Sequence, residues 1–328
     1  MKPASHSPDV RSSTLRAWPL ALALTLGCPG LALAAEGGVG HALPGGMATL
    51  IDRPPTKPGW VVEPIYLHYE GSASASRAIP IAGSLAAGLT ASSDALMLGG
   101  LYTFTPTPLG AHYSLGAYVP YVWTSVSAQL DTPLGTVRRR DRAAGFGDLT
   151  LIPAMLAWQT GFWQVSATLP VYAPTGQYQK GRQANPGLNY WTFDPTLGVS
   201  YGNDKSGLNA SLYLGLAMNT ENPATRYHSG STLHLDASIQ QLLPVGPGFL
   251  GIGAEAFYLD QVTPDSGAGA RLGGFQGRTA GVGPVLSYVL PRGTKTLVAE
   301  LRWLPEVDVS NRLKGDYVWL KLVCQFGK

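Results

Sequence analysis

The side chains that could carry chemistry lie mostly at every second position of apolar segments. Glu300 and Arg302, for example, alternate with Leu301 and Trp303. Successive side chains of a β-strand point to opposite faces, so this spacing predicts strands with one polar and one apolar face. Eight ionisable residues share the placement: Asp148, Asp194, His234, Asp236, Glu255, Glu300, Arg302 and Lys321. They could take part in solute passage, or they could pair with one another as structural elements.

The sequence lacks the motifs that usually mark an enzyme. It contains no Gly-x-Ser-x-Gly, no His-Glu-x-x-His and no cysteine cluster with zinc spacing. His234 could be drawn as a base beside Ser238 or Ser211, the arrangement of a serine nucleophile. A polar strand residue explains His234 more simply. We therefore expect no catalytic residue, no metal and no cofactor.

The N-terminus has the pattern of an export signal. Positive residues precede an apolar stretch at 17–26, and Ala32-Leu33-Ala34 fits the small-x-small cleavage rule. The stretch is too short for a spanning helix, which needs about 20 apolar residues. A lipoprotein signal ending at Cys28 is the alternative, but Thr25 stands where Leu is expected. We expect a signal peptide over 1–35, and its cleavage leaves Cys324 without a disulfide partner.

Composition and periodicity favour a chain whose surface does not face water. Charged residues make up 13%, against roughly 25% in typical proteins. The net charge of +3 is too small to indicate nucleic-acid binding. About twelve segments alternate between apolar and polar residues, near 60–70, 93–104, 111–127, 147–159, 162–172, 191–202, 208–219, 231–242, 249–261, 277–290, 296–304 and 316–326. Short and long links alternate between them, and 128–146 is among the expected long loops.

This pattern predicts an all-β protein, an antiparallel transmembrane β-barrel of about twelve strands over residues 59–328. Even strand numbers, short periplasmic turns and long outer loops are typical of bacterial outer-membrane barrels. A soluble β-sandwich or propeller would explain the strands but not the alternation of links. Arg or Lys facing lipid at mid-depth costs roughly 2–4 kcal/mol, so the eight ionisable residues are expected to line the lumen. Residues 36–58, rich in Gly and Pro, are expected to form a periplasmic segment that folds into the barrel and narrows it.

Several long motifs resemble one known family. They are Leu-Pro-Val-Tyr-Ala-Pro-Thr-Gly-Gln-Tyr at 169–178, Asn-Pro-Gly-Leu-Asn-Tyr-Trp-Thr-Phe-Asp-Pro at 185–195, the segment 219–230, and Gly147-Asp148-Leu149. The segment 37–59, with His41, matches as well, so the likeness covers nearly the whole mature chain. The sequence resembles the meta-pathway phenol-degradation family of outer-membrane proteins. That resemblance implies a barrel channel or transporter for aromatic or other hydrophobic compounds.

We therefore expect a channel of the bacterial outer membrane that admits small hydrophobic solutes and is not an enzyme. Its expected partners are outer-membrane lipid, the solute and the barrel-assembly machinery, with no nucleic acid. The terminal signal for assembly is displaced, because Phe326 is followed by Gly327 and Lys328. The alternatives are an outer-membrane lipid-modifying enzyme and a structural or surface-interaction barrel.

Overall fold

The computed structural model describes residues 40–73, 79–81, 84–86, 88–105, 107–132, 135–271 and 273–327. The chain divides into two units, Met1–Leu31 and Ala32–Lys328, and every described residue belongs to the second. The expected signal peptide at 1–35 lies outside the described residues. Within them, no helix is long and apolar enough to cross a bilayer.

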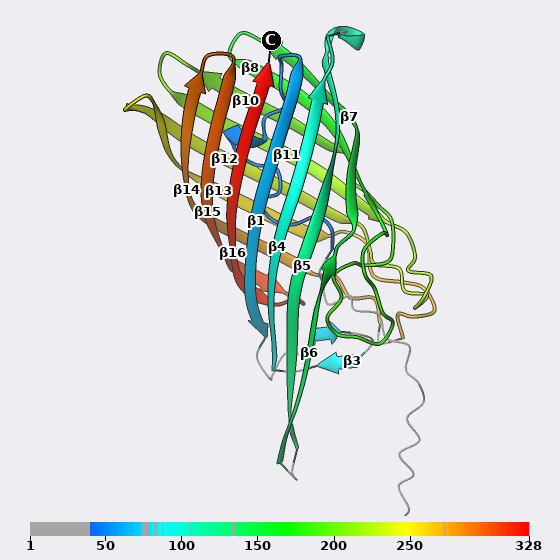
Figure 1. The fold of residues 1–328 in the computed structure, drawn as a ribbon. Coiled ribbons are helices and arrows are strands. Elements are labelled where there is room, and N and C mark those ends of the chain that lie inside the picture. The colour runs from blue at the N-terminus through cyan, green and yellow to red at the C-terminus, as the bar shows by residue number, and fades with distance from the viewer. Residues whose placement is uncertain are drawn as a thin grey trace, which may run out of the picture. The chain divides into compact units, whose positions relative to one another are not determined.

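Twelve antiparallel strands of the described residues close into a barrel, which confirms the predicted fold. The strands follow one another around the ring in sequence order, and β16 pairs with β1 to close it (Figure 1). They are β1 (Gly59–Ala73), β4 (Leu89–Thr103), β5 (His112–Thr132), β7 (Leu149–Thr160), β8 (Trp163–Ala173), β10 (Thr196–Asn203), β11 (Leu208–Asn219), β12 (Thr232–Val245), β13 (Gly248–Gln261), β14 (Arg278–Arg292), β15 (Lys295–Ser310) and β16 (Lys314–Gly327).

The short links are tight turns. Gly246 joins β12 to β13 with a φ of 58°, and Gly293 joins β14 to β15 with a φ of 59°. Glycine adopts this left-handed conformation without the steric cost that a Cβ would add. The link between β4 and β5 contains a short 3₁₀ turn, η2 (Pro108–Gly110). These turns fix the register of the strands that they join.

The segment at 128–146 differs from the sequence-based expectation of a long loop. It forms the end of β5 and the strand β6 (Gly135–Phe146), which pair as a hairpin. The hairpin reaches beyond the neighbouring strands (Figure 1). A second small hairpin, β2 (Ile79–Ile81) with β3 (Ser84–Ala86), lies in the link between β1 and β4.

Two strands are interrupted where an aspartate enters the interior. Gly147 and Asp148 separate β6 from β7, and Asp194 and Pro195 separate the short β9 (Thr192–Phe193) from β10. The chain keeps its place in the sheet across both breaks, since Gly147 N donates to Pro120 O and Asp194 N donates to Pro170 O. Both carboxylates are buried. The interruptions therefore place acidic groups inside the barrel on either side of β8.

The strands have their apolar faces outside and their polar faces inside. On β10, Leu197 is 62% exposed and Ser200 is 2% exposed. On β14, Val282 and Leu286 are exposed while Ser287 is buried. A soluble protein buries such apolar side chains, whereas a transmembrane barrel presents them to lipid as an outward apolar band. Aromatic residues occupy that surface, among them Trp60, Phe146, Trp163, Trp191 and Phe326 near strand ends, and Trp123 and Trp303 in the middle of their strands.

Residues 40–58 precede β1 and run inside the ring of strands, where Figure 1 shows them in blue. We call them the N-terminal segment. They contain one 3₁₀ turn, η1 (Leu50–Asp52), and Asp52 Oδ2 accepts hydrogen bonds from the backbone of Ala48 and Thr49 at 2.9 and 3.0 Å. The segment has no strand pattern, so its polar groups must be satisfied by the barrel wall.

Candidate functional site

The wall formed by β12 to β16 holds the N-terminal segment through a buried ion network. Arg302 on β15 is fully buried and contacts Asp52 at 3.1 Å, Glu255 at 3.1 Å and Glu300 at 2.9 Å. Lys321 on β16 contacts Asp52 at 2.5 Å. Buried charges are tolerated when they are paired, so the two basic groups fix the carboxylate of the segment to the wall.

The backbone of the segment is bound by the same wall. Gly45 N donates to Asp236 Oδ1 at 2.9 Å, and Gly45 O accepts from Arg302 at 2.7 Å. Lys321 donates to Gly46 O at 2.7 Å, and Trp319 Nε1 donates to Pro44 O at 3.1 Å. A backbone group buried without a partner is costly, and these contacts supply partners for the middle of the segment.

The beginning of the segment is held on the other side of the barrel, around Asp148. His41 Nε2 lies 3.0 Å from Asp148 Oδ2, and the His41 ring stacks on Tyr172 with centroids 4.7 Å apart. Asp148 also accepts from Gly176 N at 2.8 Å and from Leu188 N at 2.6 Å. Four of the motifs that carry the family resemblance therefore meet at one carboxylate.

A second cluster of buried titratable groups lies beside the segment. His234 on β12 lies 2.9 Å from Asp194 and 3.5 Å from Asp236. Asp236 in turn accepts from the backbone of Gly45. The cluster thus connects the interruption before β10 to the N-terminal segment.

The structure brings the eight sequence-predicted residues into contacts around the N-terminal segment. All eight are buried. Two cavities lie beside the segment, an inner and an outer one. The inner cavity is bordered by Asp194, His234, Asp236 and Lys321, and the outer cavity by Asp148. Glu255, Glu300 and Arg302 border neither of these two cavities and instead pair with one another and with the segment.

Two cavities remain beside the N-terminal segment, against the wall formed by β1, β4, β5 and β7. The inner cavity, toward the short turns, has a volume of about 260 Å³, and its strand wall includes Val61, Ile65, Met97, Leu101, Ile152 and Met155. The outer cavity, toward the long links, has a volume of about 280 Å³, and its strand wall includes Leu67, Tyr69, Ala95, Val122 and Val126. Each is slightly smaller than the roughly 300–1,000 Å³ of most small-molecule pockets.

The two cavities share part of their lining. Met97, Thr150 and Tyr172 from the wall, with His41 and Leu43 from the N-terminal segment, border both. The lumen therefore has two unlike halves. The bound segment fills the side next to β12, β15 and β16. The cavities lie in series beside it, with a mostly apolar wall on β1, β4, β5 and β7, while Asp194, His234, Asp236 and Lys321 border the inner cavity from the other side.

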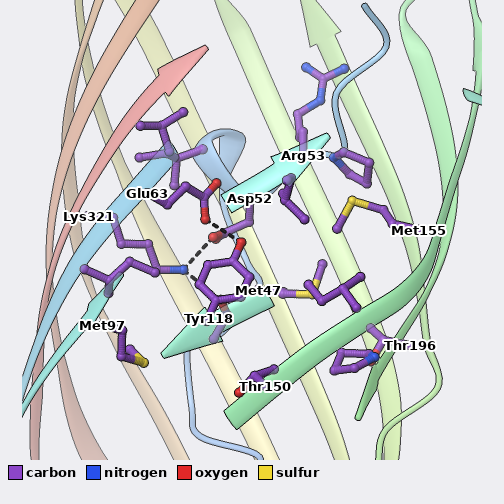
Figure 2. A pocket seen from close by; sticks show the side chains of 18 of the residues that line it. Met47, Asp52, Arg53, Glu63, Met97, Tyr118, Thr150, Met155, Thr196 and Lys321 are labelled. Carbon is purple, nitrogen blue, oxygen red and sulfur yellow. Dashed lines mark hydrogen bonds and ion pairs between the residues drawn. The ribbon is translucent and has the colours of Figure 1, made fainter. Parts of the chain in front are cut away.

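The inner cavity contains residues that sequence reasoning missed. Figure 2 shows Glu63 and Tyr118 in it beside Met47, Met97 and Met155, with Tyr118 Oη donating to Glu63 Oε2 at 2.6 Å. Met side chains adapt to irregular apolar spaces. The sequence does mark Glu63, because it is the single carboxyl group in an apolar row, between Val61 and Ile65 on one face of β1.

The serine–histidine arrangement considered from the sequence does not form. His234 and Ser238 lie four residues apart on β12, about 13 Å at the usual rise of a strand. Ser211 pairs with Ser238 and is equally distant along the barrel. The Ser238 hydroxyl donates instead to Ala48 O at 2.6 Å. In the described part of the chain, no group of three or more His, Cys, Asp or Glu side chains is arranged to bind a metal ion.

Comparison with known proteins gives a family and a fold. The model of the family described as "Putative MetA-pathway of phenol degradation" matches residues 74–322. None of the curated proteins matches the chain. The COG4313 outer membrane channel from Pseudomonas putida F1 is similar in structure, with a TM-score of 0.64 and 19% identity over 87% of this chain and 100% of that one. The β-domain of the Bordetella autotransporter BrkA gives a TM-score of 0.45 at 10% identity, over 83% of this chain and 100% of that one.

Proposed function

The chain belongs to the MetA-pathway phenol-degradation family, and we propose that it is an outer-membrane channel for small hydrophobic or aromatic compounds. The observation that carries this proposal is the division of the lumen. The N-terminal segment fills one side, and the space that remains lies against a mostly apolar wall. A solute that follows this space meets mainly aliphatic, Met and Tyr side chains, which favour apolar molecules over hydrated ones.

The outward apolar surface supports placement in the bacterial outer membrane, with lipid as a permanent partner. Transmembrane barrels of bacteria reside there. The barrel-assembly machinery is the partner that we expect during insertion. Phe326 is half-exposed near the end of β16, beside Lys295, whose ammonium lies 5.1 Å from the ring centroid.

We further propose that the chain is not a lipid-modifying enzyme. The residues that could form a serine–histidine pair have other partners. His234 contacts two aspartates, and Ser238 contacts the segment. A hydrolase of this kind needs a nucleophile and a base within hydrogen-bond reach of one another.

Uptake by cells with an intact outer membrane tests the proposed function. A host that lacks the gene is compared with the same host expressing the full chain. Expression should raise the initial uptake rate of radiolabelled toluene several-fold and leave the rate for a labelled hexose unchanged. An equal increase in the uptake rates of toluene and the hexose would indicate an unselective pore. No increase in either uptake rate would contradict the transport proposal.

A further inference from the structure

Glu63 differs from the other carboxylates around the N-terminal segment in its partners. Asp52, Glu255 and Glu300 each contact Arg302. Among the described residues, Glu63 has no ion pair, and its one hydrogen bond comes from Tyr118. Arg302 and Lys321 supply two positive charges, and three carboxylates already contact them. The network therefore has no unpaired cation for the carboxylate of Glu63.

The pairing of Glu63 with Tyr118 depends on a glycine between them. Glu63 on β1 lies opposite Gly99 on β4, and Gly99 lies opposite Tyr118 on β5. A Cβ on Gly99 would lie 2.0 Å from the Tyr118 ring, so only glycine lets the ring lie across β4 toward Glu63. Three strands therefore build one arrangement, which holds a carboxyl group at the surface of the inner cavity (Figure 2).

The second oxygen of this carboxyl group lacks a donor from the described residues. Tyr118 donates to Oε2 and leaves Oε1 to accept a hydrogen bond from elsewhere. The neighbouring strand wall is mostly Val61, Ile65, Met97 and Met155, which offer no donor. Lys321 also borders the cavity, but its ammonium already donates to Asp52 Oδ1 and Gly46 O. A polar group in apolar surroundings is stabilised by any ligand that supplies the missing partner.

From this geometry we propose that Glu63 and Tyr118 form a recognition site for the donor end of a solute. The solute class is a small molecule with an apolar body and one terminal O–H or N–H group, such as a phenolic hydroxyl. The ring lies among the Met and aliphatic side chains, and its donor reaches Glu63 Oε1. The inference rests on the proposed function, because it assigns a substrate feature to the same cavity.

Equilibrium dialysis of labelled ring compounds against the full mature chain in lipid nanodiscs tests the site. Phenol and toluene have rings of the same size and differ in the donor. After subtraction of empty nanodiscs, the wild type should bind phenol at least about tenfold more tightly than toluene, the effect of one hydrogen bond to a carboxylate. Glu63→Met keeps a side chain of similar length and should reduce phenol binding to the level of toluene. Gly99→Ala should also weaken phenol binding, because it displaces Tyr118.

Matched controls separate this site from general damage. Glu70→Gln changes a carboxyl on the exposed side of β1, and Gly100→Ala changes the next residue of β4, where a Cβ has its nearest neighbour at 3.7 Å. Both should leave phenol binding unchanged. Benzylammonium tests a cationic donor in place of the hydroxyl. If it binds the wild type but not Glu63→Met, the site also accepts amines. If it does not bind the wild type, the site accepts only neutral hydroxyl groups.

The outcomes distinguish the inference from the proposed function. If the ratio of phenol affinity to toluene affinity is the same in Glu63→Met as in the wild type, the recognition site is wrong. Binding of toluene in that experiment would still support the channel proposal. Absence of binding of both rings to the wild type would overturn both. Uptake of toluene by cells that express the control variant Glu70→Gln should remain at the wild-type rate, because Glu70 lies on the exposed side of β1.

Discussion

Gly45 allows the backbone of the N-terminal segment to lie directly against the barrel wall. Its φ is 74°, and a Cβ there would lie 2.6 Å from Leu304 and 2.8 Å from Glu255. Gly45→Ala should therefore destabilise the bound segment by about 1–2 kcal/mol from the left-handed backbone alone, with the steric contact added. The measurement is the temperature at which the folded, fast-migrating form is lost in heat-modifiability gels.

Gly40→Ala is the matched control for that substitution. A Cβ on Gly40 has no neighbour within 4 Å, so its transition temperature should equal that of the wild type. If Gly45→Ala and Gly40→Ala unfold at the same temperature as the wild type, the close approach at Gly45 does not contribute to stability.

Arg302 compensates three buried carboxylates at once. Arg302→Met should leave Asp52, Glu255 and Glu300 without their common partner, and removal of one partner from a buried ion pair costs about 3–5 kcal/mol. We expect release of the N-terminal segment, measured as faster chymotrypsin cleavage after Met47 and Leu50. Arg292→Met, at an exposed turn, should cleave at the wild-type rate. Equal rates in both variants would contradict a role of Arg302 in holding the segment.

The sequence identified the charged residues of the site better than its apolar ones. Alternation within strands such as 296–304 predicted which face carried the ionisable groups, and these groups are buried. It could not predict that Asp52 would complete the network, because Asp52 lies in a segment without periodicity. Glu63 was missed because it is single in an apolar row, and its partner Tyr118 comes from two strands away.

At the scale of elements, the same alternation predicted the twelve strands, and it failed where the chain leaves the apolar band. The outward side chains of β5 change from Trp123 to Ser125 and Ser127, and those of β6 change from Phe146 to Arg142 and Arg140. The outward apolar row that marks the other strands therefore ends at this hairpin. The segment 128–146 therefore had the composition of a loop although it is a hairpin.

The long link between β8 and β9 is attached to this hairpin through Asp141. Arg182 Nη2 donates to Asp141 Oδ1 at 2.8 Å, and the backbone of Gln183 and Ala184 donates to Oδ2 at 2.9 and 3.2 Å. The hydrogen bond from Arg182, together with those from the backbone, holds the pKa of Asp141 below its ordinary value. The link borders the outer cavity at 183–188, so its attachment affects the entrance.

This contact predicts a pH dependence for the link. Because the pKa of Asp141 is lowered on folding, the contact stabilises the link above the ordinary pKa of about 3.9 and loses strength as the pH falls below it. A nitroxide attached at Lys180→Cys, in a Cys324→Ser background, should be immobile at neutral pH and gain mobility below about pH 4. Asp141→Asn should be mobile throughout, and an identical pH profile in that variant would contradict the role of Asp141.

At the scale of the whole molecule, we predict that the N-terminal segment limits how much of the lumen is open. It contacts β8, β11, β12, β15 and β16, and the two cavities lie beside it. Deletion of residues 37–58 should raise single-channel conductance in planar bilayers, because the space that the segment occupies would fill with water. That the segment narrows the path stays a prediction from sequence. Conductance equal to that of the full mature chain would contradict it.

On the proposed route, the solute passes along the apolar wall through the two cavities in turn. Met97 borders both cavities and points inward, whereas its neighbour Leu96 is 51% exposed on the outside of the same strand. The most direct measurement is the initial rate of toluene uptake by cells that express Met97→Trp or Leu96→Trp at equal levels in the outer membrane. We predict that Met97→Trp lowers the rate to that of cells without the gene and that Leu96→Trp keeps the wild-type rate. Uptake through Met97→Trp at the wild-type rate would contradict the route.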